Sequence, residues 1–140
     1  MILKIIKLTF ILILIPSILF ANTKYFEDGV NFYKNKKFKK AKFKFEQDIV
    51  LNPKNENSYL YLSKIFANLD KTNQQEQNLN TVILINPKNE EAIYNLAKLK
   101  LKSSDYEKSK QLNDRLNLLC DKFCGQSQKL ENEIKKLSKK

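Results

Sequence analysis

The two cysteines are the residues best suited to covalent chemistry in this 140-residue chain, and Cys120 and Cys124 lie four positions apart. A metal site needs more ligands, and the sequence holds no histidine to supply them. Haem attachment requires two intervening residues and a following histidine, and redox-active pairs usually have two intervening residues rather than three. Three states stay open: a structural disulfide, two free thiols and a redox-active pair.

The lack of histidine also bears on catalysis, because neither a Ser-His-Asp set nor a Cys-His set can be assembled. The only glycines are Gly29 and Gly125, which argues against a glycine-rich phosphate loop and against an all-β fold. We interpret Glu90 and Glu91 as first-turn acids that complement a helix dipole rather than as an acid–base pair. We therefore expect no enzyme, no metal and no cofactor.

The chain is strongly basic, with a formal net charge of +11, and Arg115 is its only arginine. Proteins that read a nucleic-acid sequence usually rely on arginine for bidentate contacts, so we expect no specific nucleic-acid partner. The lysines are interpreted mainly as a solvated surface, with an anionic partner as the alternative.

An internal repeat organises the chain: the segment Asn-Pro-Lys-Asn-Glu at positions 52–56 returns at positions 86–90. Apolar residues within each unit advance by three and four, which predicts helices, and proline separates the units. Positions 81–85 are β-branched enough to suggest a strand, but the repeat frame favours a helix over 72–85. The sequence therefore predicts an all-α fold with seven helices after position 21 and no sheet.

The first unit carries the fullest pattern, with Tyr25, Gly29 and Phe32 on one face of a helix and Ala41 and Phe45 on the answering face. Gly29 is expected to let the second helix approach closely. This pattern, with its period of about 34 residues, resembles that of a small tetratricopeptide-repeat (TPR) protein. The resemblance implies an α-solenoid of three TPR helix pairs and a C-terminal capping helix. The expected repeats cover residues 22–55, 56–89 and 90–123, the capping helix covers 126–140, and the helices of the first repeat cover 22–35 and 38–51.

Residues 1–21 differ from the rest of the chain. They hold Lys4 and Lys7, no acidic residue, and an apolar run that ends at Ala21. This composition is typical of a secretory signal peptide, so we expect a mature TPR domain of residues 22–140 in the periplasm or outside the cell. The alternative is an uncleaved membrane anchor, for which the apolar run is short.

In an exported chain an even number of cysteines favours a disulfide. Pairing Cys120 with Cys124 is expected to require that the helix end between them, with Gly125 as the left-handed residue that follows. Similar cysteine pairs occur near the C-terminus of exported bacterial TPR proteins, which this tail resembles.

The TPR resemblance also implies that the first helix of each repeat lines a concave groove that holds a segment of a partner protein. Tyrosines interleaved with lysines would suit a peptide with aromatic or acidic side chains. The alternative is that these tyrosines serve partly in packing. The lysine–asparagine clamp of chaperone-binding TPR domains is not implied, because Phe26, Val30 and Glu91 stand at clamp positions. The predicted partner-binding residues are Tyr33, Tyr61, Lys64, Tyr94, Asn95 and Lys98.

Together these features predict an exported adaptor or scaffold that binds a protein or peptide, in envelope biogenesis or assembly. The alternative is a membrane-anchored structural protein, held on an anionic bilayer by an uncleaved N-terminal helix and the lysine-rich first repeat. A thiol-redox factor is a third reading. Membrane contact is expected only if the N-terminal segment is retained.

Overall fold

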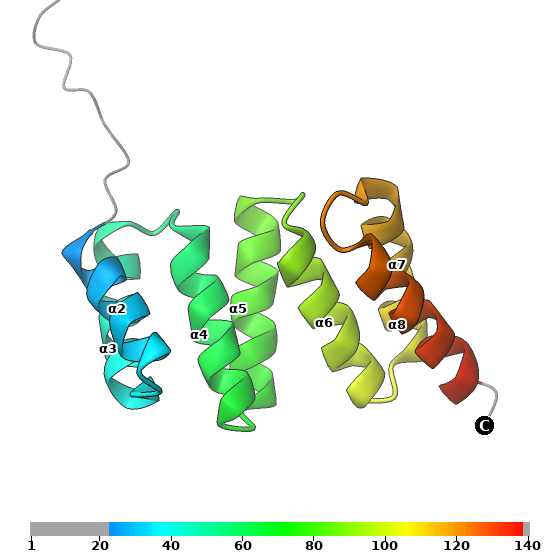
Figure 1. The fold of residues 1–140 in the computed structure, drawn as a ribbon, viewed down its shortest axis with the longest axis horizontal. Helices are drawn as coiled ribbons and strands as arrows, with labels where there is room; N and C mark the ends of the chain where they lie inside the picture. Colours follow the sequence, from blue (N-terminus) through cyan, green and yellow to red (C-terminus); the bar gives the residue numbers. More distant parts are fainter. Residues whose placement is uncertain (1–22, 139–140) are drawn as a thin grey trace, which may run out of the picture.

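The computed structural model describes residues 23–138, and over that range the chain forms α-helices joined by short loops, with no strand (Figure 1). The predicted all-α fold is confirmed. The expected signal peptide, residues 1–21, and the last two residues of the expected capping helix lie outside the described residues. The helices are α2 (Lys24–Lys34), α3 (Phe38–Leu51), α4 (Glu56–Asn68), α5 (Thr72–Ile85), α6 (Glu90–Lys102), α7 (Tyr106–Leu119) and α8 (Cys124–Leu137).

The helices form a row of antiparallel pairs along the long axis of the molecule (Figure 1). Helices α2 and α3, α4 and α5, and α6 and α7 make the three pairs, which correspond to the three predicted repeats. The second helix of each of the first two pairs also packs against the first helix of the next pair, and α8 packs against α6 and α7. This is the arrangement of an α-solenoid. None of the described helices is both long and apolar enough to cross a bilayer.

Each pair turns through a left-handed residue at the same point of the repeat. Lys36, Asp70 and Ser104 have φ angles of 56°, 52° and 63°, and they occupy equivalent positions in the three repeats. Such φ values favour glycine, yet none of the three positions carries one. The turn geometry is therefore the same in all three repeats, although none of them has a glycine at this position to indicate such a turn in the sequence.

The close approach predicted at Gly29 is confirmed. A Cβ atom added there would lie 2.7 Å from Cε1 of Phe45, and Phe45 is completely buried. In the later repeats a larger residue replaces Gly29 and a smaller one replaces Phe45, so the sum of the two sizes is roughly kept. The corresponding pairs are Ser63 with Leu79 and Ala97 with Asn113.

A buried carboxylate ties the first two pairs together. Asp48, near the end of α3, has no exposed surface. It accepts hydrogen bonds from the hydroxyls of Thr23 and Ser58 and, at 2.7 Å, from Nδ2 of Asn55. Because buried charges need such partners, these bonds fix the start of α2 and the start of α4 against the end of α3.

Candidate functional site

The tyrosines predicted for the groove on α2 and α4 contact each other. The rings of Tyr33 and Tyr61 meet edge to face, with centroids 5.1 Å apart. Tyr61 also stacks on Phe45, with centroids 4.9 Å apart and ring planes 7° apart, and both tyrosines are half-buried. These two tyrosines therefore pack in the core of the first repeats and present only part of each ring to the surface.

Lys64, one turn after Tyr61, is already engaged within the molecule. Its Nζ atom lies 2.6 Å from a carboxylate oxygen of Glu91 and 5.2 Å from the ring centroid of Tyr61. The ion pair connects α4 to α6. A bound carboxylate would have to share or replace Glu91, so Lys64 is a weaker candidate than its sequence position suggests.

The predicted residues of α6 form a second group. Lys98 is exposed, and its Nζ atom lies 5.5 Å from the ring centroid of Tyr94. Asn95 and Lys98 line a hollow of ≈ 310 Å³. The six predicted residues thus fall into two clusters, one on α2 and α4 and one on α6, which the Lys64–Glu91 ion pair joins. That these clusters bind a partner stays a prediction.

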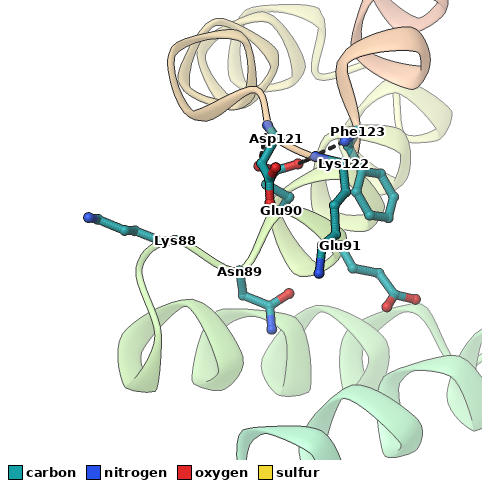
Figure 2. A pocket seen from close by; sticks show the side chains of 7 residues that line it. All are labelled: Lys88, Asn89, Glu90, Glu91, Asp121, Lys122 and Phe123. Atoms are coloured by element: carbon teal, nitrogen blue, oxygen red, sulfur yellow. Dashed lines mark hydrogen bonds between the residues drawn. The ribbon is translucent and has the colours of Figure 1, made fainter.

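The role of Glu90 at the C-terminal junction was not predicted from the sequence. Its carboxylate accepts the backbone N–H groups of Asp121, Lys122 and Phe123, at 2.7, 2.8 and 2.8 Å (Figure 2). Partial burial acts to raise the pKa of Glu90, but these amide donors and the Lys122 ammonium act to lower it, and the net pKa lies below its ordinary value. Glu90 therefore clamps the loop between α7 and α8.

A signal for this clamp was present in the repeat. Glu56 occupies the same position one repeat earlier, and its carboxylate accepts Nδ2 of Asn86 at 3.1 Å. In both repeats the glutamate that begins the first helix holds the loop that follows the second helix. The interpretation of Glu90 as a first-turn acid was therefore incomplete, because its carboxylate also binds a loop that lies beyond both helices of its repeat.

The hollow around Glu90 has a volume of ≈ 270 Å³ and is lined by both acidic and basic side chains (Figure 2). Glu90 itself is already satisfied by three donors. Within residues 23–138, no group of three or more histidine, cysteine or carboxylate side chains converges on a point where a metal could bind. We therefore assign this junction a structural role.

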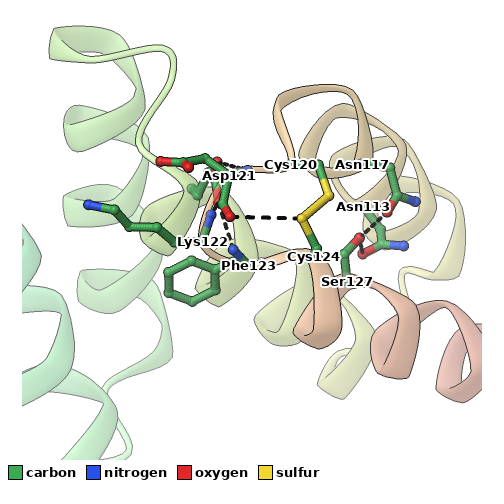
Figure 3. Close-up of a disulfide and its surroundings, with 9 residues drawn as sticks. Asn113, Asn117, Cys120, Asp121, Lys122, Phe123, Cys124 and Ser127 are labelled. Atoms are coloured by element: carbon green, nitrogen blue, oxygen red, sulfur yellow. Dashed lines mark hydrogen bonds between the residues drawn. A yellow bond between two sulfur atoms is a disulfide. The ribbon is translucent and has the colours of Figure 1, made fainter.

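The two cysteines come together next to this clamp (Figure 3). Their sulfur atoms lie at disulfide-bonding distance, and their Cα atoms are 5.0 Å apart. The helix was expected to end between the two cysteines, but α7 stops just before them, at Leu119, and α8 starts at Cys124 rather than at residue 126.

The prediction for Gly125 was wrong. Gly125 lies within α8 and has no positive φ, whereas Cys120 has a φ of 29°. Glu90 binds the backbone amides of the three residues that follow Cys120. Because this fixes the loop immediately after α7, the chain reverses at Cys120. On the other side of the pair, the buried hydroxyl of Ser127 lies 2.8 Å from Oδ1 of Asn113, and this contact seats α8 on α7 (Figure 3).

No protein-family model and no curated protein matches the sequence. Solved structures do match in fold. An Arabidopsis OM64 TPR domain is 24% identical, with a TM-score of 0.71 over 80% of this chain and 92% of that chain. The TPR2B domain of yeast Sti1, in a complex with pHsp70, is 13% identical, with a TM-score of 0.74 over 81% of this chain and 94% of that chain.

A third match is the Yersinia enterocolitica type III secretion chaperone SycD in complex with a peptide of the translocator YopD. It is 13% identical, with a TM-score of 0.73 over 82% of this chain and 90% of that chain. The described part of this chain therefore has the fold of tetratricopeptide-repeat domains.

Proposed function

We propose that the protein is an exported adaptor or scaffold that binds a segment of a partner protein on the surface formed by α2, α4 and α6. The observation that carries this proposal is the pair of tyrosine–lysine clusters on those helices. Tyr94 and Lys98 stand 5.5 Å apart on α6, and Tyr33 contacts Tyr61 across α2 and α4. Tyrosine is enriched at interfaces and among the residues that carry binding energy, because its ring is apolar and its hydroxyl is polar.

The chemistry of these clusters favours a segment with aromatic or acidic side chains. Lys98 is exposed, so its charge is available to a carboxylate, whereas Lys64 is paired with Glu91. The structural neighbours give further support, since Sti1 TPR2B is described in complex with pHsp70 and SycD with a YopD peptide. The Tyr94–Lys98 cluster is therefore proposed as the main contact for the partner.

Export and a role in envelope biogenesis or assembly are part of the same proposal. The support comes from the signal-like composition of residues 1–21 and from the approach of Cys120 to Cys124. A stable disulfide favours an oxidising compartment such as the periplasm. The mass of the protein recovered from the cell envelope provides the test: a chain that starts at Asn22 supports export, and one that retains Met1 supports the membrane-anchored alternative.

The binding site is tested with variants on α6, and far-UV circular dichroism checks that they fold, because Tyr94 also packs against Phe123 with ring centroids 5.5 Å apart. Tyr94→Ala combined with Lys98→Ala should weaken partner binding by more than about tenfold, because an aromatic anchor carries much of the energy of an interface. The control combines Lys108→Ala with Lys110→Ala on α7. It removes two positive charges, one more than the first variant, and should change affinity little. Calorimetry with the partner measures both. Equal losses in the two variants would show that general charge, and not the α6 cluster, governs binding.

A further inference from the structure

The N-terminal end of the solenoid carries an apolar hollow that lies outside the proposed groove. It has a volume of ≈ 360 Å³, and two aromatic rings line it, those of Phe32 on α2 and Phe43 on α3. Phe43 is 59% exposed although it is a large apolar residue, and Phe32 is only half-buried. Large exposed apolar side chains that gather in one place often mark an interaction surface.

The repeat shows what shape would fill this hollow. Phe66 on α4 is the residue of the second repeat that is equivalent to Phe32 in the first. Phe66 is only 7% exposed, because α3 of the preceding pair packs over it and the Nζ atom of Lys42 stands 5.9 Å from its ring. By the same geometry, Phe32 faces the place that the second helix of an earlier pair would occupy. Among residues 23–138 no helix precedes α2, so within that range nothing occupies this place.

At the C-terminal end of the described solenoid, in contrast, a further helix covers the last pair. Helix α8 packs against α6 and α7 and buries Leu130 and Ile134 to 2% and 5% exposure. A solenoid exposes the apolar face of its terminal repeat unless a further element covers that face. Here the chain supplies such an element at the C-terminal end of its described part, and the hollow with its two phenylalanines remains at the opposite end.

The charge around the hollow indicates what kind of helix fits. The other residues that line it are Lys39, Lys40 and Lys44, and no acidic residue lines it. The ammonium of Lys40 stands 5.8 Å from the ring centroid of Phe32. Lys44 has a partner in Asp28 at 3.4 Å, whereas Lys39 and Lys40 are exposed. An apolar floor with a cationic rim is complementary to apolar side chains flanked by carboxylates.

We propose that this N-terminal end face is a docking surface for an acidic amphipathic α-helix of another protein, which would lie against Phe32 as α3 lies against Phe66. This surface is separate from the α2–α4–α6 groove and would let one molecule contact two partners. Two copies docked through this same end face fit poorly, because their lysine rims would face each other. The signal-like segment of the chain itself also fits poorly, because it holds Lys4 and Lys7 and no acidic residue.

The test uses the full chain and a labelled synthetic helical peptide of about 15 residues, with leucine on one face and glutamate elsewhere. Fluorescence anisotropy measures its affinity for each variant. Phe43→Ser, and separately Lys39→Glu with Lys40→Glu, should each weaken binding by about tenfold or more. Matched controls are Leu84→Ser, at a position that is 81% exposed on α5, and Lys135→Glu with Lys136→Glu on α8, and they should leave affinity unchanged.

Three results would overturn the proposal. The unmodified chain could fail to bind the peptide, as it would if its own N-terminal segment filled the hollow. The control variants could lose as much affinity as the end-face variants, which would indicate non-specific attraction to a basic protein. Binding could instead depend on Tyr94 and Lys98 and not on Phe43, which would place the peptide in the groove and support the proposed function alone.

Discussion

Replacing Gly29 by alanine perturbs the packing of Phe45 in the first repeat. The new Cβ would lie 2.7 Å from Cε1 and 2.9 Å from Cδ1 of Phe45. Carbon atoms in favourable contact are about 3.5–4.0 Å apart, so the ring or the helix must move. The ring is completely buried, stacks on Tyr61 at 4.9 Å and meets Phe26 at 5.8 Å, so its neighbours would have to move with it.

The expected cost follows from two opposing effects. Overpacking a buried position destabilises a protein by about 1–3 kcal/mol. Alanine is favoured over glycine within a helix by about 1 kcal/mol, and Gly29 lies in the middle of α2. The net loss in the free energy of unfolding should therefore be about 0–2 kcal/mol. Gly125→Ala is the matched control, because a Cβ there meets no atom within 4 Å. It should stabilise α8 by up to about 1 kcal/mol.

Urea unfolding followed by far-UV circular dichroism measures both variants. Gly29→Ala should be less stable than Gly125→Ala by about 1–3 kcal/mol. The second repeat pairs Ser63 with Leu79, so Phe45→Leu should make room for the new methyl group, and the double variant should show a coupling energy of about 1 kcal/mol or more. If Gly29→Ala is as harmless as Gly125→Ala, or if Phe45→Leu gives no relief, the close-contact reasoning is wrong.

Ser104→Gly should stabilise the protein by about 0.5–1 kcal/mol in the same urea assay, because Ser104 has a left-handed φ of 63° that glycine adopts without strain. A loss of stability would mean that the turn depends on the serine side chain. Since the pKa of Glu90 is lowered in the folded protein, its contribution to stability is present above its ordinary pKa of about 4.3 and is lost as the pH falls through the lowered value. In Glu90→Gln the free energy of unfolding should therefore fall less steeply below about pH 4 than in the unmodified protein. An unchanged pH profile would show that the Glu90 carboxylate does not stabilise the loop in this way. Peptide mapping without reductant should find Cys120 bonded to Cys124 in protein from the envelope, and two free thiols would reject this. Reduction should raise hydrogen exchange in α8 and leave α2 to α5 protected, since repeats contact only their neighbours.

The helices could be predicted well from the sequence, because the residue patterns that indicate them are local and recur in each repeat. The apolar spacing and the repeat frame placed α3 and α5 at positions 38–51 and 72–85, which are their observed bounds. Pro53 and Pro87 marked the boundaries between repeats, since proline cannot continue a helix. The small residue at position 29 and the large one at position 45 fixed how closely the first pair of helices packs. Each of these inferences needed only residue type and spacing.

The features that the sequence did not predict depend on distant contacts or on turns without their usual residue. Glu90 clamps a loop that is distant in sequence, and only the three-dimensional path of α6 and α7 brings the two together. Cys120 adopts the left-handed turn that Gly125 was expected to supply, because the clamp fixes where the chain must reverse. Whether Tyr61 packs in the core stayed open in the sequence, because its stacking on Phe45 depends on how α3 and α4 meet.

If the surface of α2, α4 and α6 holds a partner protein, site-specific photo-crosslinking in intact cells should capture that partner from α6. Lys102 is exposed at the end of α6 and lines the same hollow as Asn95 and Lys98, so a photoreactive residue there leaves the proposed contacts in place. Gln111 is an exposed position of α7 and serves as the control. We predict that the Lys102 position captures one discrete envelope protein, that Tyr94→Ala abolishes this capture, and that the Gln111 position captures none. Capture of the same protein at Gln111 but not at Lys102, or capture at Lys102 that survives Tyr94→Ala, would mean that the partner does not bind on this surface.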